Sequence, residues 1–107
     1  MTRALVEVLT FEGCPHAEPA LVHAERVVAE SDVEATVRLV VIADASAAVE
    51  HRFLGSPTIR VNGVDVEPGA NERHEYVLAC RIYRTSTGGS EGEPDEHWLR
   101  SALEAAR

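Results

Sequence analysis

The chain has 107 residues, of which 18 are acidic and 10 basic, so its formal charge at pH 7 is −8. All the basic residues are arginines, and the absence of lysine excludes Schiff-base chemistry and a phosphate-binding P-loop lysine. The acidic balance also argues against nucleic acid and anionic membranes as partners, because phosphate groups are bound by clusters of Lys and Arg. A hydrophobic share of 45% in a chain of this length indicates one domain, residues 1–107, with a single aliphatic core.

The apolar segments and the two cysteines together predict the cellular compartment and the state of the thiols. No apolar run approaches the about 20 residues that span a bilayer, and Glu7 interrupts the first apolar residues before they resemble a secretory signal. We therefore expect a cytoplasmic protein in which Cys14 and Cys80 are reduced at rest. Two thiols are too few for a disulfide framework, so they indicate redox chemistry, metal binding or simple packing.

The first half of the chain alternates between strand and helix patterns. Residues Ala4 to Thr10 are aliphatic with one charge, which predicts an interior strand, and a turn follows from Phe11 to Pro15. Apolar residues at helical spacing predict a helix from about His16 to Glu30. The run from Ala35 to Ile42 predicts a second buried strand.

A short helix is expected next, with Asp44 as its N-cap and Gly55 as its end. Its inward-facing side chains are predicted to be Ala45, Ala48, Val49 and Phe53. A strand that begins at the proline of Ser56-Pro57 and runs to Val61 leads into Asn62-Gly63, a strong hairpin signal, and Val64 to Val66 forms the return strand.

The remaining third is less regular. Pro68 to Glu75 reads as a polar loop, Tyr76 to Tyr83 as either strand or helix, and Thr85 to Glu93 as a flexible loop. Pro94 is a suitable first residue for a final helix. The buried stripe of that helix is predicted to comprise Trp98, Leu99, Ala102, Leu103 and Ala106.

The order of elements predicts an α/β fold. A strand–helix–strand unit implies a parallel pair with a right-handed crossover, and the Asn-Gly turn adds an antiparallel hairpin. We expect a three-layer sandwich with a mixed four-stranded sheet, in the order β-α-β-α-β-β-α, and an insertion at about 68–93 before the last helix.

Two motifs carry a resemblance to a known family. The segment Thr-Phe-Glu-Gly-Cys-Pro-His-Ala after the first strand, together with Ser-Pro-Thr before the hairpin, resembles the thioredoxin-like superfamily, nearest to its small glutaredoxin-like proteins. The resemblance implies a thiol–disulfide redox protein with Cys14 as nucleophile and Pro57 as a cis-proline preceded by Ser56. It implies a small or protein disulfide as substrate and no bound cofactor, with glutathione or another low-molecular-weight thiol as co-substrate.

The sequence departs from that family at one position. Ala17 stands where a Cys-x-x-Cys motif has its second cysteine, so the usual resolving thiol is absent. The chain offers Cys80 instead, as the resolving thiol or as a core residue. In a strand, Cys80 would share a buried face with Tyr76, Leu78 and Ile82.

The surroundings of Cys14 can be interpreted without the family. A thiol at a helix start meets unpaired N–H groups and the positive end of the helix dipole, which favour the thiolate. Pro15 suits a first helical turn, a protonated His16 would add to the effect, and Glu12 and Glu18 would oppose it. The alternative is a small buried hydrophobic residue beneath a turn.

The cis-proline has a physical role in this hypothesis. It would let the backbone of Ser56 pair with an extended substrate like an added strand, with Thr58 flanking the thiol. Two other functions stay open. One is a non-enzymatic binding module that has lost redox turnover, and the other is soft-metal or organomercurial handling by Cys14 and Cys80. The stretch Cys-Arg-Ile-Tyr also resembles, more loosely, a Cys-Arg-Leu-Tyr-like stretch of small bacterial proteins, some of which are labelled alkylmercury lyases.

Other polar residues receive structural interpretations. The five histidines lack metal-ligand spacing, and His23, His51 and His97 are expected on solvated helix faces. Arg81 and Arg84 would bind a carboxylate or, as we favour, form ordinary surface ion pairs. The acidic stretches 67–75 and 91–96 are expected to be solvated loops.

Overall fold

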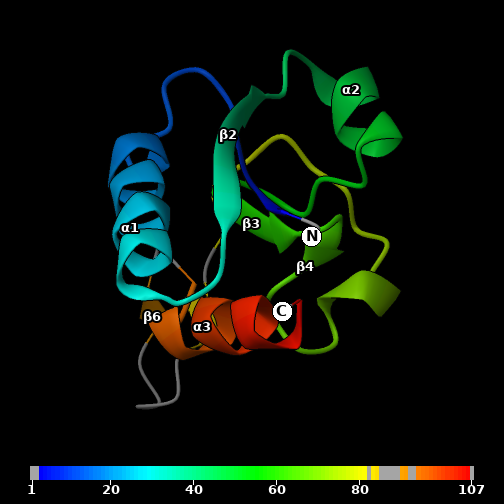
Figure 1. The fold of residues 1–107 in the computed structure, drawn as a ribbon. Coiled ribbons are helices and arrows are strands. Elements are labelled where there is room, and N and C mark those ends of the chain that lie inside the picture. The colour runs from blue at the N-terminus through cyan, green and yellow to red at the C-terminus, as the bar shows by residue number, and fades with distance from the viewer. Residues whose placement is uncertain (1–2, 82, 85–89, 92–93, 107) are drawn as a thin grey trace.

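The computed structural model describes residues 3–81, 83–84, 90–91 and 94–106. Its main sheet is mixed, four-stranded and open, with the order β2-β1-β3-β4 (Figure 1). The strands are β1 (Ala4–Thr10), β2 (Ala35–Val41), β3 (Thr58–Val61) and β4 (Val64–Asp65). The helices are α1 (Ala17–Glu30), α2 (Ala45–Glu50) and α3 (Glu96–Ala105), with a single 3-10 turn, η1 (Ala70–Glu72).

Strand β1 is the centre of the sheet, as its apolar sequence predicts. It pairs in parallel with β2, after the crossover through α1, and antiparallel with β3. The predicted Asn-Gly hairpin is confirmed, because Asn62 (φ 52°) and Gly63 (φ 84°) both adopt the left-handed conformation that a tight two-residue turn requires. The Asn62 side chain also accepts a hydrogen bond from the Leu5 amide, which ties the turn to β1.

The larger core lies between the sheet and the pair of helices α1 and α3. It is formed by alternate residues of β1 and β3 and by one stripe of each helix, and its fully buried members are all aliphatic. They include Val6, Val8, Ala20, Ala24, Val27, Ile59, Leu99 and Leu103. Trp98, Ala102 and Ala106 are half-buried against this core, so the predicted stripe of α3 is confirmed.

A smaller core lies on the opposite face of the sheet, beneath α2. It comprises Leu9, Ile42, Ala48 and Phe53. Asp44 caps α2 as predicted, since its side chain accepts a hydrogen bond from the Ala47 amide. The prediction was wrong for Ala45 and Val49, which are exposed, and for the helix end, which falls at Glu50. Because α2 is so short, only Ala47 and Ala48 face the sheet, and the left-handed Arg52 returns Phe53 to the core.

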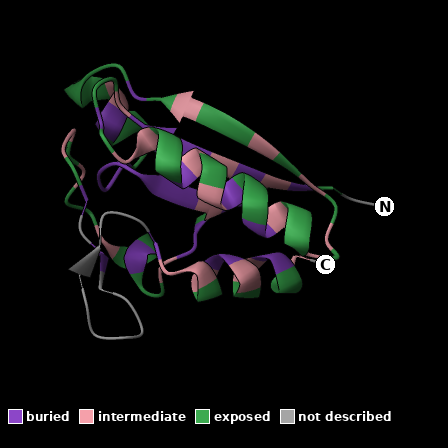
Figure 2. Ribbon diagram, turned by 90° about the vertical axis from the view of Figure 1, so that its left-hand side faces the viewer, coloured by how far each residue is buried: buried purple, intermediate pink, exposed green. Residues whose placement is uncertain are grey.

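The prediction that the second strand is buried was also wrong. Strand β2 is the edge of the sheet, and it is the largely green and pink outer strand in Figure 2. Leu39 is 45% and Val41 57% exposed. A continuous apolar run is compatible with a buried strand, but it does not report how many neighbours the strand acquires.

The insertion is less regular than either alternative for residues 76–83. Cys80 forms a single β-bridge with Ser56, and β5 (Tyr83–Arg84) pairs with β6 (Ser90–Glu91). Most of the predicted flexible loop, residues 85–89 and 92–93, lies outside the described residues. Pro94 precedes α3 instead of opening it, because Asp95 is the N-cap and its side chain accepts from the His97 amide.

Four charged side chains join α1 to α3 on the surface. Arg26 and Glu30 belong to α1, and Glu96 and Arg100 to α3. Each arginine forms ion pairs with both glutamates, so two of the four pairs join the helices. Hydrogen bonds from Arg26 and Arg100 lower the pKa of Glu96 from 4.5 to about 2. No helix in the described part of the chain combines the length and apolar character needed to cross a membrane.

The lowered pKa of Glu96 predicts a pH-dependent contribution to stability. We expect Glu96→Gln to reduce the free energy of unfolding at neutral pH by less than about 1 kcal/mol, since the pair is solvent-screened. Because the folded-state pKa of about 2 lies below the ordinary 4.5, this contribution is present above pH 4.5 and lost as the pH falls towards 2. Urea unfolding of both proteins across that range measures it.

The matched control is Glu25→Gln, which changes an exposed carboxylate of α1 outside these ion pairs. A difference between Glu96→Gln and the wild type that stays constant from pH 7 to pH 2 would contradict the assignment.

Candidate functional site

The two motifs singled out from the sequence lie at one end of the sheet. Cys14 follows the C-terminal end of β1, and the Ser56–Pro57 peptide precedes the start of β3. These strands are antiparallel and Leu9 pairs with Thr58. The segment that follows β1 and the segment that precedes β3 therefore lie at the same end of the sheet. The Ser56–Pro57 bond is cis, which confirms the expectation for Pro57.

Cys14 lies in the turn between β1 and α1. Its side chain is buried, although its neighbours Gly13 and Pro15 are exposed, so the thiol lies just beneath the surface. The Cys14 amide donates to the carbonyl of Phe11, and its carbonyl accepts from the Ala17 amide, each at 3.2 Å. Both hydrogen bonds join backbone groups, so they stabilise the turn without involving the Cys14 sulfur.

The helix start offers the thiol fewer donors than the sequence predicts. Helix α1 begins at Ala17 with His16 as N-cap, three residues after Cys14. In its first turn the Ala17 amide is bonded to Cys14, the Ala20 amide is bonded to His16, and Pro19 has no N–H. Among the described contacts, the amides of His16 and Glu18 are the ones near this helix start for which no backbone partner is found.

The backbone of Ser56 is already paired with the chain itself. Its amide donates to the carbonyl of Ala79, and its carbonyl accepts from the amide of Arg81, both at 2.8 Å. This is a parallel bridge centred on Cys80. The edge that we expected an extended substrate to occupy is therefore filled by residues 79–81.

Cys80 is exposed, so the alternative that it is a core residue was wrong. A strand would bury it with its neighbours of the same face, but among the described residues 76–81 the structure shows an isolated bridge and no continuous strand. Tyr76 and Leu78 are half-buried, and Ile82 lies outside the described residues. The bridge with Ser56 instead brings Cys80 to the sheet end where Cys14 follows β1.

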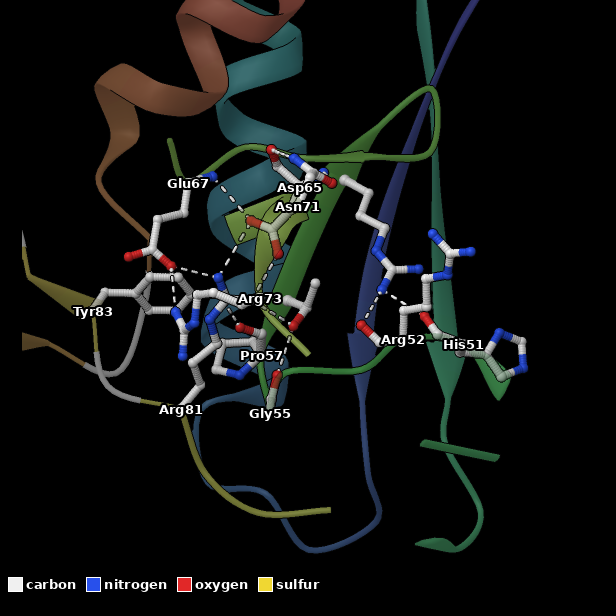
Figure 3. Close-up of polar contacts among 12 residues, drawn as sticks. His51, Arg52, Gly55, Pro57, Asp65, Glu67, Asn71, Arg73, Arg81 and Tyr83 are labelled. Carbon is white, nitrogen blue, oxygen red and sulfur yellow. Dashed lines mark hydrogen bonds and ion pairs between the residues drawn. The ribbon is translucent and has the colours of Figure 1, made fainter. Parts of the chain in front are cut away.

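A buried arginine holds this segment in place (Figure 3). The Arg81 side chain is 2% exposed, and its guanidinium donates to both carboxylate oxygens of Asp65, at 2.8 and 3.3 Å. It also donates to Glu67 and, at 2.9 Å, to the Thr58 hydroxyl. The cation lies 4.4 Å from the ring centroid of Tyr83.

The groups around Arg81 are bonded in turn to the cis-proline segment. The Thr58 hydroxyl donates to the Gly55 carbonyl at 2.6 Å, and the Tyr83 hydroxyl donates to the Pro57 carbonyl. Burial raises the pKa of Tyr83, so its hydroxyl stays a neutral donor. The Thr58 hydroxyl that was expected to flank a substrate is thus engaged in this network.

Gly55 allows the two segments to approach closely. A Cβ atom at this position would lie 2.9 Å from the Cβ of Arg81, and the Gly55 φ of +121° is one that L side chains rarely adopt. From the sequence, Gly55 was predicted to end the short helix that Asp44 begins. Its structural role is to admit the Arg81 segment beside Ser56.

The buried role of Arg81 was not predicted from the sequence. Neither alternative considered for it, a surface ion pair or a ligand-binding arginine, anticipates a buried pair with Asp65. Two features of the sequence could have indicated the buried pair. One is the single charge of Arg81 inside an otherwise apolar run, and the other is the pair of acidic residues Asp65 and Glu67 at alternate positions after the Asn-Gly turn. The Arg84 side chain lies outside the described residues.

Two further expectations about polar residues need correction. Glu67 is half-buried and contacts both Arg81 and Arg73, so the stretch 67–75 is not wholly a solvated loop. His23 is half-buried, and its Nε2 is enclosed without a hydrogen-bond partner among the described residues. His51 and His97 are exposed as expected. Within the described ranges, no group of three or more His, Cys, Asp or Glu side chains is arranged to hold a metal ion.

A scan against protein-family models and a search of curated proteins found no match to this chain.

The Arg81–Asp65 pair predicts a large cost for removing one charge. We expect Asp65→Asn to lower the free energy of unfolding by about 3 kcal/mol, because it leaves a buried guanidinium under-compensated while conserving side-chain size. Denaturant unfolding at neutral pH measures the change. The control is Asp44→Asn, the same substitution at the N-cap of α2, where Asn caps equally well and the expected change is within about 0.5 kcal/mol. A loss for Asp65→Asn within about 0.5 kcal/mol, as expected for the control, would contradict the importance of the buried pair.

Proposed function

We propose that this is a thioredoxin-like thiol–disulfide redox protein in which Cys14 is the nucleophile and Cys80 the resolving thiol. The observation that carries the proposal is the bridge between Cys80 and Ser56. It holds the second cysteine of the chain beside the cis-proline, at the sheet end where Cys14 follows β1. The mixed sheet in the order β2-β1-β3-β4, with the cis-proline at the start of β3, is compatible with this fold family.

The reaction proceeds in two exchange steps. The Cys14 thiolate attacks one sulfur of a disulfide, forms a mixed disulfide with it and releases the other half as a thiolate, which takes up a proton. The Cys80 thiolate then attacks the Cys14 sulfur, and the Cys14–Cys80 disulfide forms as the second half of the substrate departs. The substrate gains two electrons and the protein loses two. A low-molecular-weight thiol returns them by the reverse exchange.

Residues next to Cys14 assist these steps in the proposal. Pro15 is exposed and directly follows the nucleophile, so in the proposal it contacts the substrate. The side chain of His16, the N-cap residue, makes no capping hydrogen bond. It stands two residues after the nucleophile, and we assign it to contact with the bound substrate in this proposal.

The two other functions considered from the sequence have less support. A binding module would take a peptide or small ligand at the hairpin and the helix start. An extended peptide beside the cis-proline needs free backbone groups on Ser56, and both are bonded to residues 79–81. Handling of a soft metal would use the same two thiols and needs no third ligand. No larger group of metal-binding side chains surrounds them among the described residues, so no described contact favours it over exchange.

The proposal predicts different products for the wild type and a Cys80→Ser variant. Treatment with the neutral disulfide 2,2′-dithiodipyridine should convert the wild type to an intramolecular disulfide, because Cys80 resolves the adduct on Cys14. The Cys80→Ser protein should instead retain a thiopyridyl adduct on Cys14. Mass spectrometry of the intact proteins identifies the products, and pyridine-2-thione absorbance measures the thiol released.

The matched control is Cys14→Ser, which should form an adduct on exposed Cys80 and no internal disulfide. It should also lose turnover of bis(2-hydroxyethyl) disulfide with an external thiol. A wild-type protein that carries stable adducts on both cysteines, or a Cys14→Ser variant with full turnover, would contradict the proposed function.

A further inference from the structure

We infer that this site takes small disulfides and does not recognise extended peptides, because a segment of its own chain occupies the position of an added strand. The inference rests on the proposed redox function and narrows its substrate class. It is carried by the contacts of three residues, Ala79 to Arg81, with the segment around the cis-proline.

Strand addition requires an unpaired amide and carbonyl on the receiving edge. At Ser56, beside Pro57, both groups are taken by the Ala79 carbonyl and the Arg81 amide. A substrate peptide would have to displace this segment before it could form a single main-chain hydrogen bond with Ser56. The two main-chain hydrogen bonds that an extended substrate would form with Ser56 are therefore already made within the molecule.

The occupying segment is firmly anchored. Displacing it would pull the Arg81 guanidinium away from Asp65 and Glu67, and the buried Asp65 carboxylate would lose this cation. It would also separate the guanidinium from the Tyr83 ring and open the close packing against Gly55. A peptide that offers only new main-chain bonds does not compensate for these losses.

A small disulfide does not meet this obstacle. Cys14 lies under the exposed residues Gly13 and Pro15, and reaching its sulfur requires no strand pairing. The exposed side chain of Cys80 is presented on the occupying segment itself. The segment thus supplies the resolving thiol of the proposed function and excludes the peptide at the same time.

The test compares two substrates with the same leaving group. One is N-acetylcysteine amide and the other an uncharged nine-residue peptide with a central cysteine, each as a mixed disulfide with 2-mercaptoethanol. For the wild type we expect the peptide to have a kcat/KM no greater than that of the capped amino acid. A strand-pairing site would gain about 1 kcal/mol or more from each of two hydrogen bonds, so a preference for the peptide of about tenfold or more would overturn the inference.

Arg81→Met provides the second arm, because it removes the guanidinium while keeping an unbranched apolar stem. The ratio of peptide to capped amino acid should rise in this variant, as the Ser56 edge becomes accessible. A ratio that stays at the wild-type value in a folded variant would count against the inference, and if the variant does not fold the wild-type ratio decides alone. Failure of the wild type to reduce either substrate would instead overturn the proposed function.

Discussion

The ion pair between Arg81 and Asp65 is the interaction on which the arrangement of the candidate site depends. The Arg81 guanidinium donates hydrogen bonds to Thr58 at the start of β3, to Asp65 at the end of β4, and to Glu67 two residues further on. These segments are distant in sequence from the stretch that carries Arg81. Because a buried cation is costly without its partners, the chain has few ways to satisfy Arg81 other than the observed position of residues 79–81.

This constraint explains how a chain without a Cys-x-x-Cys motif can place two thiols at one end of its sheet. Cys14 is positioned locally, by the turn that connects β1 to α1. Cys80 is positioned from a distance, by its bridge to Ser56, which the neighbouring Arg81 stabilises. Ala17, in the place of the second motif cysteine, lies in the first turn of α1. Of the two thiols, Cys14 in the turn is buried and Cys80 in the insertion is exposed.

The elements predicted correctly from the sequence are those determined by local patterns. The bounds of β1, the course of α1, the Asn62-Gly63 turn and the Asp44 cap all follow from spacing or turn chemistry within a few residues. The cis bond before Pro57 was anticipated through the family resemblance, since its local sequence alone would favour the trans form.

The features that were missed depend on contacts between distant segments. The edge position of β2 exposes Leu39 and Val41, although their sequence is as apolar as that of the central strand. The exposure of Cys80 and the burial of Arg81 are set by pairing with Ser56 and Asp65. Gly55 was assigned to a helix end because nothing near it in the sequence reveals the approach of Arg81.

Amide hydrogen exchange by NMR tests the central claim most directly, namely that residues 79–81 are held on the Ser56 edge in the native protein. The amides of Ser56 and Arg81 each donate across this bridge. The account predicts that both exchange as slowly as amides of the central strand β1, and that Arg81→Met accelerates them selectively while β1 stays protected. Exchange of both amides in the wild type at the rate of solvent-exposed loop amides would contradict it.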